Sequence, residues 1–112
     1  MWTVEIDERA LAEVNGLPAL LKARLALYIR KIERSGLQSL EPGAARQTDG
    51  KLWELRLKAD VGIARALYFT LHPKRVCIVS AFVKKSQKLP ANEKSKAEAR
   101  LKEKIAAEPP KK

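Results

Sequence analysis

The chain has 112 residues, 46% of them hydrophobic, and a formal net charge of +10 at pH 7. This length suits one domain around a single core, and no apolar run approaches the roughly 20 residues of a membrane-spanning helix. The acidic N-terminal segment lacks the apolar stretch of a secretory signal. The single cysteine cannot form an internal disulfide, so the composition favours a cytoplasmic protein.

The charge is unevenly distributed along the chain. Residues 1–45 contain six basic and six acidic side chains, so the whole surplus of +10 lies in residues 46–112. A basic surplus in one part of a domain is typical of proteins with a polyanionic partner. The alternative is an ordinary soluble surface, but the surplus coincides with predicted strands and not with a tail.

The first part of the chain predicts a strand and a helical hairpin. Residues 1–6 alternate between apolar and polar side chains, as half-buried strands do. Asp7 can cap the helix that follows, and an Asn-Gly pair and a Ser-Gly pair end the two helices. We expect the hairpin over residues 7–36 and a loop over residues 37–50. One face of the second helix has the apolar residues Leu21, Leu25, Tyr28 and Ile32.

Residues 51–83 predict a meander of three antiparallel strands. The first strand alternates an apolar set with a charged set, namely Trp53, Leu55 and Leu57 with Glu54, Arg56 and Lys58. We expect the apolar set to pack on the helices and the charged set to face solvent. Polar turns separate the strands, and the apolar run over residues 76–82 is typical of a buried central strand.

The second strand of this meander contains a conflict. Arg65 shares one side of the strand with Leu67 and Phe69, so an exposed Arg65 would bring two large apolar side chains into solvent. Two arrangements resolve the conflict: either both faces of the strand are covered, or a β-bulge near Arg65 interrupts the alternation.

Basic residues follow the third strand, and a final helix is predicted over residues 90–107. Pro90 stands at a favourable early position, and a narrow apolar stripe recurs at every fourth residue, comprising Ala97, Leu101 and Ile105. The predicted order is therefore β-α-α-β-β-β-α. It describes a single α+β domain over residues 1–112, with an antiparallel sheet, the helical hairpin on one face and a C-terminal helix.

Three segments in this order form a recognisable pattern. They are LWELR at residues 52–56, G-x-x-R-x-L-Y-F at residues 62–69 and A-F-V-K-K-S-Q-K-x-P at residues 81–90. The pattern resembles the RelE/HigB superfamily of toxins from type II toxin–antitoxin systems, and in particular its phage-derived HigB-like branch. The resemblance covers nearly the whole chain. It implies a RelE-like, microbial-ribonuclease-like fold and a ribosome-dependent endoribonuclease, or mRNA interferase, that inhibits translation. It also implies neutralisation by a cognate helix-turn-helix antitoxin.

The resemblance also implies site residues. Arg65 matches the family's arginine on the middle strand, and Arg56 matches the basic position on the strand before it. Lys84 and Lys85 match the basic cluster after the last strand. The chain departs from the family at the general base, because the segment after Lys88 lacks the tyrosine or the histidine and aspartate that other members use. We expect Arg56, Arg65, Lys84 and Lys85 to be catalytic, with the proton acceptor unassigned.

Further residues are candidates for binding RNA. Tyr68 and Phe82 have rings on which a base could stack, although either would equally suit a core. Basic residues on the same stretch complete this set, namely Lys58 and Lys88. One histidine and one cysteine cannot build a metal site, so we expect no metal and no cofactor.

Two other functions remain open from the sequence. A basic domain of this kind can be a non-catalytic module that binds RNA or the ribosome, with salt-sensitive affinity. It can also be an inactive relative that keeps only the surface for an antitoxin. The endoribonuclease differs from both in making new RNA ends.

Overall fold

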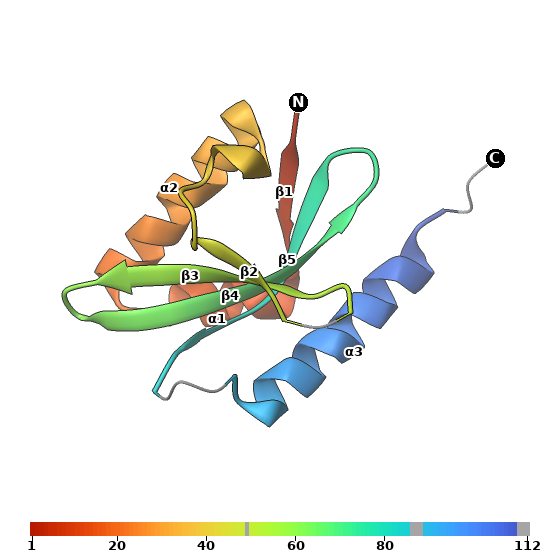
Figure 1. Cartoon of the computed structure of the whole chain (residues 1–112). Helices are drawn as coiled ribbons and strands as arrows, with labels where there is room; N and C mark the ends of the chain where they lie inside the picture. Colours follow the sequence, from red (N-terminus) through yellow and green to blue (C-terminus); the bar gives the residue numbers. More distant parts are fainter. Residues whose placement is uncertain (49, 86–88, 110–112) are drawn as a thin grey trace.

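A five-stranded sheet with helices on both faces forms the centre of the fold (Figure 1). The computed structural model describes residues 1–48, 50–85 and 89–109. The elements in chain order are β1 (Thr3–Ile6), α1 (Glu8–Asn15), α2 (Ala19–Ser35), the 3₁₀ turn η1 (Leu37–Ser39), β2 (Ala45–Gln47), β3 (Trp53–Ala59), β4 (Gly62–Leu71), β5 (Arg75–Val83) and α3 (Ala91–Ala107). Within the described ranges, none of the helices has the length and apolar character needed to cross a membrane.

The predicted α+β class and element order are confirmed, with two differences. The strand order is β1-β5-β4-β3-β2, and β1 runs parallel to β5, so the sheet is mixed and not wholly antiparallel. The segment predicted as a loop contains η1 and β2, and β2 pairs with Trp53–Leu55 of β3. A strand of three residues is too short to show a period of two, so this pairing depends on the neighbouring strand.

The helical hairpin forms as predicted. The Asp7 side chain caps α1 by accepting a hydrogen bond of 2.8 Å from the backbone N–H of Arg9. The second helix ends at Gly36, whose φ of 86° favours glycine. The predicted apolar face of α2 is buried, comprising Leu21, Leu25, Tyr28 and Ile32.

Helices cover both faces of the sheet, which resolves the conflict at Arg65. The hairpin packs on one face, where Leu55 and Leu57 are buried as predicted and Trp53 is partly buried. The other face packs against α3 through a second core of Leu52, Leu67, Phe69, Cys77, Val79, Ala97 and Leu101. We call this second side the α3 face.

A β-bulge also lies beside Arg65, in β5. Leu67 pairs with Ser80 whereas Tyr68 pairs with Ile78, so Val79 is an extra residue. Val79 belongs to the core under α3, and the Ser80 hydroxyl donates a hydrogen bond of 3.2 Å to Glu93 of that helix. The extra residue is in β5, so the alternation of β4 around Arg65 continues without interruption. Of the two alternatives, the covering of both faces is the one that resolves the conflict.

Ion pairs fix α3 in place. Arg100 is buried and donates to both carboxylate oxygens of Glu13, at 3.1 and 3.2 Å, and to the carbonyl of Val79 at 2.8 Å. Among the described residues, the same helix makes three further pairs with other parts of the chain, which are Lys96 with Glu13, Glu103 with Arg9 and Lys104 with Asp7. Just beyond the helix, Glu108 pairs with Arg75 at 2.5 Å.

Candidate functional site

Three of the four predicted catalytic residues lie close together on the α3 face. Arg56 of β3 stands opposite Arg65 of β4, which stands opposite Phe82 of β5. The backbone N–H of Lys84 donates to the carbonyl of Ile63 at 2.8 Å, so Lys84 lies beside the start of β4. Antiparallel pairing thus brings the three cations to one end of the sheet. Lys85, the fourth, is exposed next to them.

Arg65 is the deepest of these cations, with a relative exposure of 3%. Its Nε donates to Glu54 Oε1 at 3.2 Å, and a terminal nitrogen donates to the carbonyl of Ala64 at 3.0 Å. Burial lowers the pKa of the Arg65 guanidinium, while the charge of Glu54 acts in the opposite direction. In the free protein, Arg65 is therefore held beneath the surface by Glu54 and by a backbone carbonyl.

The prediction that Glu54 faces solvent is wrong. Its relative exposure is 6%, with Leu67 opposite it on β4 and the buried Arg65 side chain paired with it. A carboxylate is tolerated in such a place when it is paired and hydrogen-bonded. The partner is Arg65, so the buried carboxylate and the buried arginine of this site are paired with each other.

Arg46 joins the site from a segment that was predicted to be a loop. It lies in β2 directly opposite Glu54, and it is exposed. Its charge acts to lower the pKa of both Arg65 and Lys84. The basic residue itself was visible in the sequence, but its position depends on the pairing of β2. We call Arg46, Arg56, Arg65 and Lys84 the cation cluster.

Lys84 has the environment of a proton-transfer group. Partial burial lowers the pKa of its ammonium group, and the charges of Arg65, Arg56 and Arg46 lower it further, with Glu54 opposing them. A lysine with a lowered pKa can exchange a proton closer to neutral pH than an ordinary lysine can.

The predicted RNA-binding residues differ in how exposed they are. Lys58 is exposed on β3, two residues beyond Arg56, and Phe82 is partly buried beside Arg65. Tyr68 is only 2% exposed and belongs to the core under the helical hairpin, where burial raises its pKa to about 12. A base cannot reach it, so the prediction that Tyr68 stacks on RNA is wrong. Lys88 lies outside the described residues.

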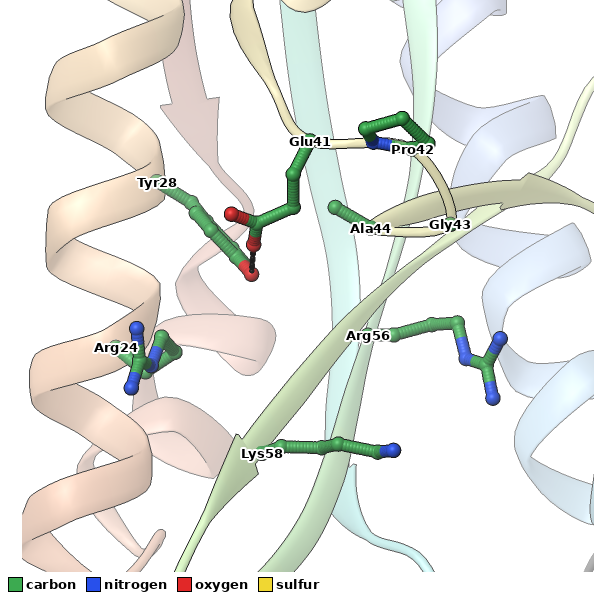
Figure 2. Close-up of a pocket in the computed structure, with 8 residues that line it drawn as sticks. All are labelled: Arg24, Tyr28, Glu41, Pro42, Gly43, Ala44, Arg56 and Lys58. Carbon is green, nitrogen blue, oxygen red and sulfur yellow. Dashed lines mark hydrogen bonds between the residues drawn. The ribbon is translucent and has the colours of Figure 1, made fainter.

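A hollow of about 400 Å³ adjoins the cation cluster (Figure 2). It lies where β3 continues past the end of β2, and its lining comprises Arg24, Tyr28, Glu41, Pro42, Gly43, Ala44, Arg56 and Lys58. The Tyr28 hydroxyl donates a hydrogen bond to the Glu41 carboxylate. The Nε of Arg56 is buried without a hydrogen-bond partner among the described residues. Arg56 and Lys58 thus belong to both the hollow and the charged end of the sheet.

Comparisons with known proteins identify the family. A family model described as "Phage derived protein Gp49-like (DUF891)" matches residues 12–102. A solved structure of the Escherichia coli toxin RelE in the free state, with two arginines replaced by alanine, is similar with a TM-score of 0.63. The two sequences are 20% identical, and the match covers 89% of this chain and 97% of that chain. No curated protein matches this sequence. The chain belongs to the phage-derived Gp49-like family and has the RelE fold, in agreement with its resemblance to the RelE/HigB superfamily.

Proposed function

We propose that this protein is the toxin of a type II toxin–antitoxin system and that it cleaves messenger RNA on the ribosome. The cation cluster is the observation that carries this proposal, because its residues come from three neighbouring strands and the end of β5 and converge on one surface. The RelE fold supports the proposal. The site of action is then cytoplasmic, and the partner that neutralises the protein is a helix-turn-helix antitoxin.

The cations suit cleavage at a phosphate. In this reaction the RNA 2′-oxygen forms a bond to phosphorus, the bond from phosphorus to the 5′-oxygen breaks, and the 2′ proton passes to water. Arg56 and Arg46 hold the phosphate oxygens from the surface, and the Arg65–Glu54 pair lies beneath them. Lys84 protonates the departing 5′-oxygen, a role that its lowered pKa favours.

Mapping of RNA 5′ ends tests this function. Expression of the wild-type protein is expected to arrest growth and to create new 5′ ends in ribosome-bound messages. Lys84→Met is expected to reduce cleavage roughly 10²–10³-fold, which is typical for removing one preorganised charged group. Arg75→Gln serves as the control, because Arg75 lies at the other end of β5 in pairs with Glu5 and Glu108. Unchanged cleavage by a folded Lys84→Met variant would remove Lys84 from the site.

A non-catalytic module that binds RNA or the ribosome is the second candidate. It is favoured by the absence of a histidine from the cation cluster, since the single histidine, His72, follows the far end of β4. This function predicts growth arrest and salt-sensitive binding without new 5′ ends. Co-purification with the product of the neighbouring gene tests the antitoxin separately from either activity.

A further inference from the structure

The hollow beside the cation cluster has features of a site for one nucleotide. Its volume of about 400 Å³ falls within the roughly 300–1,000 Å³ that small-molecule sites occupy. Arg56 and Lys58 lie on its β3 side, and both also lie on the strand that carries the proposed phosphate site. A nucleotide in the hollow could therefore be covalently continuous with an RNA strand whose phosphate sits on the cation cluster.

The polar groups of the hollow are arranged around one carboxylate. Tyr28 is buried, and its hydroxyl donates a hydrogen bond to Oε1 of Glu41. Burial and Glu41 raise the pKa of Tyr28 to about 12, so the hydroxyl keeps its proton and remains a donor. In the part of the chain that the structure describes, the Glu41 carboxylate accepts no other hydrogen bond, and only the backbone carbonyl of Glu41 accepts a further one, from Ala44. The carboxylate is thus oriented and still has acceptor capacity for a ligand.

A cation completes the recognition surface. The charge of Arg24 acts on Tyr28 in opposition to that of Glu41, which places Arg24 close to this pair. Figure 2 shows Arg24 and Tyr28 both projecting from α2 on the same side of the hollow. Within the described ranges, Arg24 forms no ion pair, so its guanidinium is available as a donor.

We propose that this hollow binds one nucleotide of the RNA next to the cleaved phosphate and selects guanine through Glu41 and Arg24. Guanine presents two adjacent N–H donors and a neighbouring carbonyl acceptor on its Watson–Crick edge, the edge by which unstacked RNA bases are read. Glu41 accepts from the two donors, and Arg24 donates to the carbonyl. Adenine would turn an unprotonated ring nitrogen toward the carboxylate. The proposal rests on the proposed function for its RNA substrate.

Titration of the full-length protein with 5′-GMP and with 5′-AMP, followed by NMR chemical shifts, tests this selection. We expect GMP to bind at least roughly tenfold more tightly than AMP, the discrimination that a bidentate base contact provides. Glu41→Gln is expected to reduce the ratio to about twofold or less, because an amide offers one acceptor in place of two. Glu33→Gln is the matched control, since Glu33 is an exposed carboxylate on the same helix as Arg24 and does not line the hollow. It should keep the wild-type ratio.

The outcomes separate this proposal from the proposed function. Equal affinities, a preference for AMP or no binding of either nucleotide would overturn the guanine site, whether or not the protein cuts RNA. A GMP preference that Glu41→Gln abolishes would support the site even if no new RNA 5′ ends are found, and in that case only the cleavage would be rejected. If cleavage occurs, mapped cuts should lie beside guanine for the wild type and lose this enrichment in Glu41→Gln.

Discussion

Cations in two regions of this molecule are held in opposite ways. Where α3 docks, Arg75 and Arg100 are paired with carboxylates from other elements. In the cation cluster, only Arg65 has a carboxylate partner among the described residues, and Arg56 has a buried Nε without any partner. The same residue types therefore fasten a helix in one region and remain available to an anion in the other.

The difference follows from where the acidic residues stand. The helix-docking region draws carboxylates from β1, α1 and the C-terminal segment, such as Glu5, Glu13 and Glu108. Among the described residues, Glu54 is the carboxylate that pairs with a member of the cation cluster, and its partner is the buried Arg65. A phosphate bound at the cluster would supply negative charge to the cations that have no carboxylate partner in the part of the chain that the structure describes.

Arg65→Ala tests the one paired cation of the cluster, and it has the largest expected effect. We expect a loss of about 3–5 kcal/mol in the free energy of unfolding, because removal of Arg65 leaves Glu54 buried without its partner. Urea unfolding measures this loss. Glu54→Leu/Arg65→Met is expected to recover most of the stability, and it is the better variant for asking whether Arg65 is needed for toxicity. If Arg65→Ala is as stable as the wild type, the buried pair is wrongly described.

Arg100→Ala tests how much the docking pairs stabilise the fold. We expect a loss of about 1.5–3 kcal/mol in the free energy of unfolding, since Arg100 donates charge-assisted hydrogen bonds to Glu13 and another hydrogen bond to a buried carbonyl. Burial raises the pKa of Glu13, but hydrogen bonds from Arg100 and Lys96 outweigh it and lower the pKa overall. Stability from Glu13 should therefore be present above its ordinary pKa and be lost as pH falls through the lowered value.

Unfolding of Arg100→Ala should accordingly depend less on pH in the acidic range than unfolding of the wild type. Lys102→Ala is a suitable control, because Lys102 is an exposed residue of the same helix. Equal losses in the two variants would mean that the docking pairs add little to stability.

Asp7→Asn isolates one charge of the docking region, with a smaller effect. Asparagine still caps a helix, so the substitution mainly removes the charge. Hydrogen bonds from Arg9 lower the pKa of Asp7 to about 2. The carboxylate should stabilise the fold fully above pH 4, and this contribution should disappear as pH falls toward 2. We expect Asp7→Asn to lower the free energy of unfolding at neutral pH by about 1–2 kcal/mol. The loss is limited because solvent screens the half-exposed Arg9.

Thermal unfolding between pH 2 and pH 5 measures this difference. The curves of the wild type and Asp7→Asn should converge at the acidic end. A constant gap between them across that range would instead point to a loss of capping, and it would contradict the pairing of Asp7 with Arg9.

Arg46→Gln has the smallest expected effect, and it tests whether the Arg46 side chain contacts an RNA phosphate. Each phosphate contact contributes roughly −0.7 to the slope of log affinity against log salt for a single strand. We expect the slope to become shallower by about that amount, because Arg46 is exposed and has no carboxylate partner among the described residues. Arg75→Gln should leave the slope unchanged. Similar slopes for Arg46→Gln and the wild type would exclude Arg46 from the RNA surface.

Local patterns predicted the helices well and the sheet incompletely. The apolar face of α2 follows from the spacing of Leu21, Leu25 and Ile32 within one helix, so it can be predicted from a short stretch of sequence. The parallel pairing of β1 was missed because its partner, β5, is distant in the sequence. The strand β2 was missed because three residues are too few to show a period of two. The resemblance to a toxin family indicated Arg56, Arg65 and Lys84, but it did not predict their proximity to Arg46.

The amino-acid sequence by itself determined the helical hairpin, the three long strands, the basic surplus and the family, because these follow from periodicity, composition and local motifs. Only the tertiary structure decided which cations remain available. The burial of Glu54 beside Arg65 and the separate pairing of Arg100 with Glu13 follow from how the sheet and helices pack. A charge is available to a ligand only when no other charge of the fold neutralises it, and that depends on contacts between residues far apart in the chain.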